Sequence, residues 1–226
     1  MNDLLRVEKL HKSFWIDHKE IQVIKNVSFQ AQEGEMISIV GASGAGKSTL
    51  LHILGALDRP TSGEVFFENE SLFQKRDTEL SLFRNKKVGF IFQFHHLLPE
   101  FNAVENVMMP ALISGMNKNM ARGLAEKKLE EVGLSHRLRH KPGELSGGEQ
   151  QRVAISRALM LHPKLLLADE LTGNLDTKTG EQIQELLLGL NQTYRMTVIV
   201  VTHNEALAQR LPKRFQMVDG NLLYKG

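Results

Sequence analysis

The chain has 226 residues, a formal net charge of +2 and 42% hydrophobic residues, which is the composition of an ordinary globular protein with its own core. So small a net charge argues against a general polyanion-binding surface, and the absence of cysteine excludes disulfides and cysteine-ligated metals. Residues 1–9 lack the apolar run of a signal peptide, and no stretch approaches the ~18 apolar residues of a membrane-spanning helix. We therefore expect a cytosolic chain that meets any membrane through partners.

Apolar runs predict alternating strands and helices in the first part of the chain. The expected strands lie at 4–10, 21–30, 35–40, 65–67 and 88–92. A helix is expected from Lys47 to about Leu57, where Asp58-Arg59-Pro60 ends it.

The pattern becomes mostly helical from about residue 102 to 162. Beyond it, 165–168 and 197–201 are continuous apolar runs, which are typical of buried parallel strands. A helix between these two runs presents a sheet-facing stripe formed by Ile183, Leu186, Leu187 and Leu190. Asp219-Gly220-Asn221 predicts a last hairpin turn.

This order of elements predicts a single domain with two lobes. We expect residues 1–93 and 163–226 to form an α/β core, and residues 94–162 to form a helical lobe inserted into it.

A glycine-rich loop follows the third expected strand and matches the pattern G-x-x-x-x-G-K-[ST]. Its residues are Gly41, Ala42, Ser43, Gly44, Ala45, Gly46, Lys47, Ser48 and Thr49. The glycines let consecutive N–H groups turn toward phosphate oxygens, and the following helix adds the positive end of its dipole. We expect Lys47 to reach the β- and γ-phosphates, Ser48 to ligate Mg²⁺ and Thr49 to make another phosphate contact. A strand before the loop and a helix after it argue against a chance glycine-rich turn.

Two acids, Asp169 and Glu170, end the apolar run at 165–168. The carboxyl ends of parallel strands are where open α/β sheets bind ligands, so Asp169 is expected to hold Mg²⁺ and Glu170 to activate the attacking water. Many strands end in acidic turns, and the pattern gains its weight from the glycine-rich loop in the same chain.

Polar side chains also stand at the ends of two other predicted strands. His203 follows the run at 197–201, where its ring could sense the γ-phosphate, although an ordinary surface histidine is the alternative. Gln93 follows the strand at 88–92, where its amide could contact Mg²⁺ or the attacking water. A second glycine-rich segment, Leu145-Ser146-Gly147-Gly148-Glu149, precedes a predicted helix in the helical lobe.

Together these segments resemble the ATP-binding subunit of an ABC transporter. The match runs the length of the chain in the expected order, through 41–49, Gln93, 145–152, 165–170, 174–176 and His203. The resemblance implies an α/β fold of the P-loop NTPase type, the ABC cassette. Its parts are a mostly parallel sheet core, an antiparallel β subdomain and the inserted helical lobe.

The resemblance also implies a homodimer that encloses two ATP molecules. In such a dimer Ser146, Gly147 and Gly148 of one copy cap the γ-phosphate held by the other copy's Lys47, and Asp176 with Asn174 lies at the interface. A helix N-cap is the alternative reading of Ser146, although a cap does not explain two glycines.

An aromatic side chain is implied to stack on the adenine. Phe14 aligns with this position in the family, and Trp15 beside it is an alternative. One residue departs from the family pattern, since Leu171 follows Glu170 where proline is common. Leucine restores an N–H and frees φ, so we expect a looser turn and slower hydrolysis in an enzyme that is still active.

Within the family, the segment 89–99 is similar to the lipoprotein-releasing and macrolide-export branch. This likeness implies an ATPase at the cytoplasmic face of a bacterial inner membrane, bound to integral membrane subunits of the LolC/LolE type. The stretch Phe94–Pro110 could dock such a subunit, although the helical spacing of Val104, Val107 and Met108 fits core packing equally well.

Three other functions share these motifs. A macrolide or peptide exporter is the nearest, but its cassette is often fused to membrane helices. An ATP-gated scaffold could recruit a cell-wall hydrolase through a membrane protein. A cassette acting on nucleic acid or ribosomes usually carries two cassettes or long insertions, and the near-neutral charge gives no phosphate-tracking surface.

Overall fold

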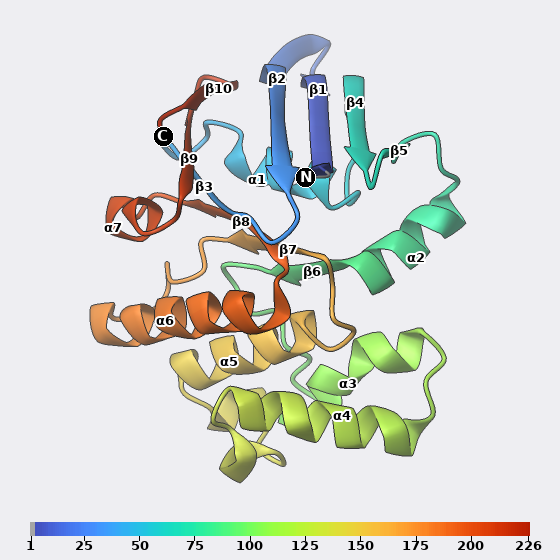
Figure 1. Ribbon diagram of the computed structural model, residues 1–226, viewed down its shortest axis with the longest axis vertical. Helices are drawn as coiled ribbons and strands as arrows, with labels where there is room; N and C mark the ends of the chain where they lie inside the picture. Colours follow the sequence, from blue (N-terminus) through green and yellow to red (C-terminus); the bar gives the residue numbers. More distant parts are fainter. Residues whose placement is uncertain (1–2) are drawn as a thin grey trace.

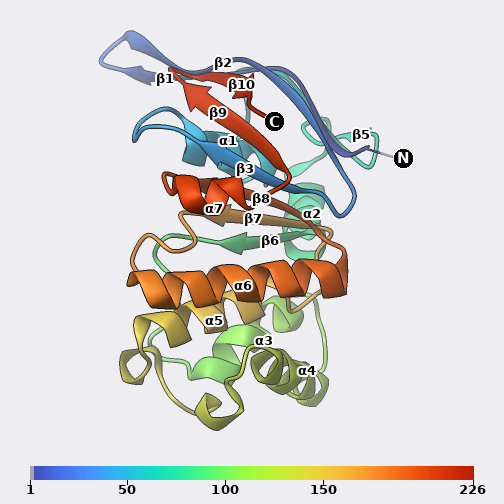
Figure 2. The same cartoon turned by 60° about the vertical axis from the view of Figure 1, so that its left-hand side comes forward.

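The computed structural model describes residues 3–226, which form stacked layers (Figures 1 and 2). A four-stranded antiparallel sheet lies at one end, and a six-stranded sheet lies in the middle with α1 between the two sheets. Helix α6 lies beneath the six-stranded sheet, and α5, α3 and α4 follow below it (Figure 2). No helix within residues 3–226 is long and apolar enough to cross a membrane.

The six-stranded sheet has the order β10-β9-β3-β8-β7-β6, and every neighbouring pair is parallel except the edge pair of β10 with β9. The central strands β3, β7 and β8 are almost entirely apolar and buried because both faces of the sheet are covered there, whereas β9 and β10 at one edge carry polar residues. Their bounds are β3 Met36–Val40, β6 Val88–Ile91, β7 Leu165–Asp169, β8 Thr197–Thr202, β9 Lys213–Val218 and β10 Asn221–Tyr224.

Alternation along these strands divides the apolar side chains between two cores. Ile37 and Ile39 of β3 face the core that also contains α1 and the antiparallel sheet, whereas Met36 packs into the core with α3, α4, α5 and α6. The antiparallel sheet has the order β2-β1-β4-β5, with bounds β1 Asp3–Ile16, β2 Lys19–Gln32, β4 Ser62–Phe67 and β5 Glu70–Ser71.

The helices occupy both sides of the six-stranded sheet. The α-helices are α1 Lys47–Leu54, α2 Asp77–Lys87, α3 Ala103–Ile113, α4 Lys118–Glu131, α5 Gly147–Ala158, α6 Thr177–Tyr194 and α7 Glu205–Gln209. Two short 3₁₀ turns, Ser135–Arg137 and Pro142–Glu144, precede α5. The last hairpin turn forms at Asp219 and Gly220, as predicted, with φ values of 45° and 79°.

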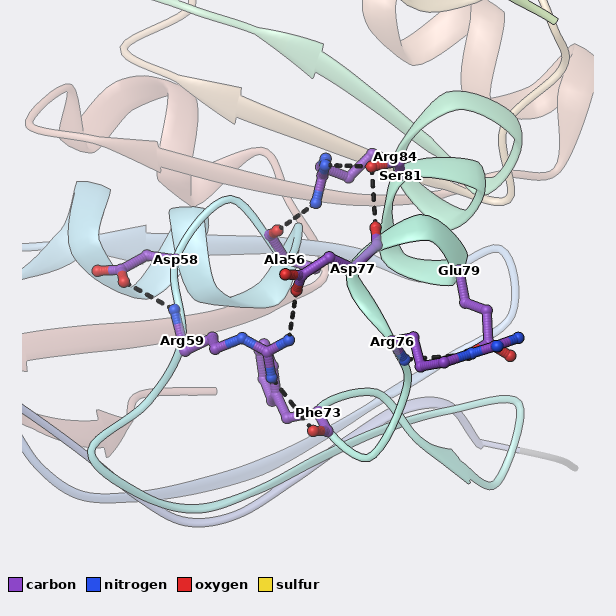
Figure 3. Close-up of polar contacts among 9 residues, drawn as sticks. All are labelled: Ala56, Asp58, Arg59, Phe73, Arg76, Asp77, Glu79, Ser81 and Arg84. Atoms are coloured by element: carbon purple, nitrogen blue, oxygen red, sulfur yellow. Dashed lines mark hydrogen bonds and ion pairs between the residues drawn. The ribbon is translucent and has the colours of Figure 1, made fainter.

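Helix α1 is shorter than the sequence predicts. It ends at Leu54 instead of about Leu57, because Ala56 adopts a left-handed φ of 55°. The Ala56 carbonyl then accepts a hydrogen bond of 2.9 Å from Nη1 of Arg84 (Figure 3).

Helix α2 is absent from the sequence prediction. Its start is held by an ion pair of 2.7 Å between Arg59 Nη2 and Asp77 Oδ1, and Glu79 accepts from the backbone N–H of Arg76 (Figure 3). Only Leu80 and Phe83 of this helix are buried, so its sequence carries little apolar periodicity.

Candidate nucleotide-binding site

The predicted glycine-rich loop connects β3 to α1 and is shaped for an anion. Gly44 and Gly46 have φ values of 78° and 103°, which side chains other than glycine rarely adopt. Gly46 is also the N-cap of α1 and supplies no side-chain acceptor, so the first N–H groups of the helix point outward without a cap. A Cβ at Gly46 would lie 2.7 Å from the carbonyl oxygen of Val23. The loop is therefore a preformed cradle for phosphate oxygens.

Lys47 lies across this loop. Its Nζ donates to the carbonyl oxygens of Gly41, at 2.8 Å, and Ala42, at 3.1 Å, and the residue is 8% exposed. Both partners of the ammonium group are neutral backbone carbonyls, so these contacts hold it in place without a carboxylate to balance its charge. A phosphate in the cradle would supply that counter-charge.

The ends of four parallel strands meet beside the loop around a cavity of about 600 Å³. Loop, strand ends and catalytic candidates come together there as expected for open α/β sheets. The lining residues are Val23, Ser43, Gly44, Gly46, Lys47, Ser48, Thr49, Gln93, Asp169, Glu170 and His203. Sequence reasoning missed Val23, an apolar residue inserted as a bulge in β2 between Gln22 and Ile24.

Asp169 and Ser48 form the oxygen pair that a hard cation needs. Burial raises the pKa of Asp169, and a hydrogen bond with the Ser48 side chain opposes that effect. Hydroxyl and carboxylate oxygens at the foot of a phosphate cradle fit Mg²⁺.

Glu170 is the most constrained acid of the cavity. It has a left-handed φ of 49°, and its backbone N–H donates to Val201 O at 2.9 Å. Its Oε2 accepts from the Thr202 hydroxyl at 3.2 Å, and its Oε1 lies 3.0 Å from Nδ1 of His203. Residues at the end of β8 thus fix the orientation of the Glu170 carboxylate. The sequence analysis did not predict Thr202 as one of its partners.

The turn after Glu170 is anchored at several points. Leu171 is 2% exposed, and its carbonyl accepts a hydrogen bond of 2.9 Å from the buried side chain of Gln151. Gly173 N–H donates to Glu170 O at 3.0 Å. Leucine in place of proline therefore gives a packed turn instead of the loose one expected from the sequence.

The second glycine-rich segment begins α5 but does not line this chain's own cavity. Ser146 and Glu149 form a capping box, in which Glu149 N–H donates to Ser146 Oγ and Ser146 N–H donates to Glu149 Oε2. The Ser146 N–H and the Arg137 guanidinium, 2.8 Å from Oε1, lower the pKa of Glu149. A Cβ at Gly148 would lie 2.5 Å from the Thr179 methyl, so this position favours glycine, whereas one at Gly147 would make only a tight contact of 3.3 Å with the end of the Leu175 side chain.

The segment before α6 links Gln93 to this region. Asn174 Nδ2 donates to Gln93 O at 2.9 Å. Asp176 is the N-cap of α6 and accepts from Thr179 N–H at 3.0 Å; the side-chain and backbone hydrogen bonds of Thr179 lower the pKa of Asp176.

The strand register separates the two aromatic candidates. Phe14 pairs with Ile21 on β2, and Val23, two residues further along β2, lines the cavity. Adjacent strand residues point to opposite faces, so Phe14 and Trp15 lie on opposite sides of β1, and the bulge at Val23 breaks the alternation that would relate either side to the cavity. Trp15 pairs with Glu20 on the other face and is 69% exposed.

These features define an α/β ATPase of the phosphate-loop type. The family model described as "ABC transporter" matches residues 24–173, and the chain belongs to this family. The fold class predicted from the sequence is confirmed by solved structures. The dimeric bacterial ABC transporter cassette MJ0796 superposes with a TM-score of 0.89 at 41% identity over 96% of both chains. The same cassette bound to ADP and Pi gives 0.89 at 40% identity, again over 96% of both chains.

Curated relatives are similar over nearly their full length. The chain is 55% identical to the "Lipoprotein-releasing system ATP-binding protein LolD" of Geobacter metallireducens over 99% of both chains. It is 53% identical to the protein of that name from Myxococcus xanthus, over 97% of this chain and 98% of the relative.

Proposed function

We propose that this chain is the ATP-hydrolysing subunit of a lipoprotein-releasing ABC transporter. The observation that carries the proposal is the single cavity in which the phosphate loop, Asp169, Glu170 and His203 meet at the carboxyl ends of parallel strands. The similarity to LolD proteins supports the lipoprotein cargo, the cytoplasmic face of the inner membrane and membrane partners of the LolC/LolE type. A macrolide or peptide exporter is the alternative.

Within one chain, each group of the cavity has a distinct task. The N–H groups of residues 42–49 and the Lys47 ammonium bind the phosphates. Ser48, Asp169 and the Gln93 amide would hold Mg²⁺, which would supply positive charge against the phosphates. Glu170 takes a proton from the attacking water, and His203 donates a hydrogen bond to the γ-phosphate. Phe14, which lies on the opposite face of β1 from Trp15, stacks on the adenine.

The cavity is completed by a second copy of the chain. Ser146, Gly147 and Gly148 begin a helix away from their own cavity, so the Ser146 hydroxyl and the N–H groups of Gly147 and Gly148 can cap the γ-phosphate of the other copy. Asp176 lies at the start of α6 beside them and joins the interface. The dimeric cassette MJ0796 supports this arrangement. Phosphate loss then removes the charge between the copies, and they separate.

Glu170→Gln tests the shared cavity. The amide keeps the shape of the side chain but accepts no proton, so ATP binding remains, turnover falls more than 100-fold and ATP drives a stable dimer. Gel filtration with light scattering, with and without ATP, measures the dimer. A wild-type rate per chain that does not change with protein concentration would sink the shared cavity.

The helical lobe, residues 94–162, passes motion to the membrane subunits. An apolar groove of about 480 Å³ lies where it meets the core, lined by residues of α2, β6, α3 and α5 that include Asn85, Phe90, Pro110 and Ile113. Val104, Val107 and Met108 are buried, so this part of the stretch Phe94–Pro110 belongs to the core. We propose that the groove receives a cytoplasmic helix of the membrane subunit.

Ile113→Asp tests the groove, since Ile113 is 71% exposed and a charge there opposes an apolar helix. Met120→Asp is the matched control, because Met120 is 67% exposed on α4 outside the groove. ATPase activity of the isolated chain should stay within twofold in both variants. Co-purification with the membrane subunits in detergent should be lost only in Ile113→Asp, and equal retention in both variants would disprove the docking site.

A further inference from the structure

Arg157 holds the chain just beyond Gln93 by two consecutive carbonyls. It lies in the last turn of α5, where Nη2 donates to His95 O and Nη1 donates to His96 O, both at 2.7 Å. Among residues 3–226 no carboxylate forms an ion pair with this guanidinium. A planar fork that binds two carbonyls at once fixes direction as well as distance.

A second side chain of α5 holds the chain just before the helix and also lies beside His95. Gln150 lies two turns before Arg157 on the same face of the helix, and its Nε2 donates to Pro142 O and Leu145 O. Burial lowers the pKa of His95, against a smaller opposing effect of a hydrogen bond with the Gln150 side chain. Helix α5 therefore holds the His95 carbonyl through Arg157, and Gln150 lies beside the His95 ring.

The other side of the segment belongs to the nucleotide cavity. Gln93 lines that cavity, and its carbonyl accepts from Asn174 Nδ2 at 2.9 Å. The Phe92 ring packs edge-on against the His96 ring with centroids 5.4 Å apart. Residues 92–96 are thus a short strap with the nucleotide cavity at one end and α5 at the other.

We infer that Arg157 is a positioning residue that makes the Ser146 segment follow the position of Gln93. Helix α5 is rigid, and at 1.5 Å per residue it places Ser146 about 16 Å from Arg157. A shift of Gln93 on nucleotide binding moves the carbonyls of His95 and His96, and the guanidinium transmits this shift as a rotation of α5. This inference rests on the proposed function, in which the Ser146 segment caps the other copy's nucleotide.

Arg157→Met removes the fork and keeps the length of the side chain. In the otherwise wild-type chain, the KM for ATP should stay within twofold and kcat should fall at least 10-fold. In the Glu170→Gln background, ATP-driven dimerisation should weaken at least 10-fold. Arg157→Lys keeps the charge without the fork and should recover only part of both losses.

Arg84→Met is the matched control. Arg84 and Arg157 both line the apolar groove where the helical lobe meets the core. Arg84 also donates to a backbone carbonyl, that of Ala56, but both residues of this contact belong to the core. Its kcat, KM and dimerisation should stay within twofold of wild type. Equal losses in Arg84→Met and Arg157→Met would overturn the positioning role and leave only support of the fold.

A distance measurement separates positioning from folding. The chain has no cysteine, so Asn119→Cys on α4 and Gln192→Cys on α6 accept spin labels at exposed sites of the lobe and the core. Both proteins carry Glu170→Gln. When ATP is added, the distance between the two labels should change in the protein that keeps Arg157. In the protein with Arg157→Met, the distance should stay at its nucleotide-free value although ATP still binds. An unchanged response in Arg157→Met overturns the inference. A Glu170→Gln chain that never dimerises would instead overturn the proposed function. If Arg157→Met does not fold, Arg157→Lys takes its place in the same comparison.

Discussion

Nδ1 of His203 lies 3.0 Å from Oε1 of Glu170, and the backbone N–H of His203 lies 3.4 Å from Oε2 of the same carboxylate. One residue therefore touches both oxygens of the expected general base. The Glu170 side chain is largely buried, whereas the His203 side chain is 69% exposed. We expect the exposed ring to leave the carboxylate and turn to the γ-phosphate while the backbone contact stays, which would link the expected base to the bond that breaks.

His203→Ala should lower kcat about 100-fold and leave the Kd for ATP within about threefold, because the ring acts when charge develops on the γ-phosphate. His203→Gln should retain part of the rate, since an amide N–H can donate to the same oxygens. Steady-state kinetics with a separate ATP-binding titration measures both constants. His18→Ala, at the exposed tip of the first hairpin, is the control. A raised KM with unchanged kcat would mean that the ring contributes only uniform binding.

Gly148→Ala should separate the start of α5 from the start of α6. The new methyl would lie 2.5 Å from Thr179 Cγ2, and overpacking of this kind costs about 1–3 kcal/mol. We expect a lower Tm and loss of ATP-driven dimerisation in the Glu170→Gln background. Gly123→Ala is the control, because nothing lies within 4 Å of its added Cβ, and it should be neutral or stabilising.

Thr179→Ser provides the rescue of this variant. It removes the methyl that clashes but keeps the hydroxyl that bonds to Asp176. The double variant should regain most of the lost stability and dimerisation, so the interaction energy of the cycle is large. Losses that simply add would show that the glycine is required for a reason other than this contact.

The catalytic candidates could be predicted from the sequence because each follows a recognisable strand or loop. Glu170 and His203 end apolar runs, and parallel strands bring such ends to one edge. Helix α2 could not be predicted, because it buries little apolar surface and is held by Arg59, which lies outside it. The hydrogen bonds from Arg157 to residues 92–96 could not be predicted from the sequence either, because their acceptors are backbone carbonyls, which every residue supplies.

The two aromatic candidates were adjacent in the sequence, and only the strand register distinguishes them. We expect Phe14→Ala to raise the Kd for ATP about 10-fold, since stacking on a base is worth about 1–3 kcal/mol. Trp15→Ala should stay within twofold. Calorimetry with ATP and with inorganic tripolyphosphate checks the cause, because only the nucleotide offers a base and tripolyphosphate affinity should not change. A larger loss in Trp15→Ala would reverse the assignment.

Asp169 is expected to give the cavity a pH dependence of its own. Burial raises its pKa above that of the unfolded chain, so the native state binds the proton more tightly between the two values. Stability of the nucleotide-free protein therefore falls as pH rises through this window, and the ionised carboxylate is a cost at neutral pH. Mg²⁺ needs the ionised form, so Mg²⁺ affinity in the presence of ATP falls as pH is lowered through the raised pKa.

Asp169→Asn should separate the two effects. The amide keeps a hydrogen-bond partner for Ser48 without a charge, so the Tm of the nucleotide-free protein should rise by a few degrees at pH 7.5. For a chain of this size, about 1 kcal/mol of stability corresponds to roughly 2–4 °C in Tm. This advantage should shrink as pH falls, because the wild-type carboxyl becomes neutral. Mg²⁺-dependent turnover should be lost at every pH. Thermal unfolding and Mg²⁺ titrations between pH 5 and 8 measure both, and a variant less stable than wild type at pH 7.5 would show that the carboxylate is already compensated.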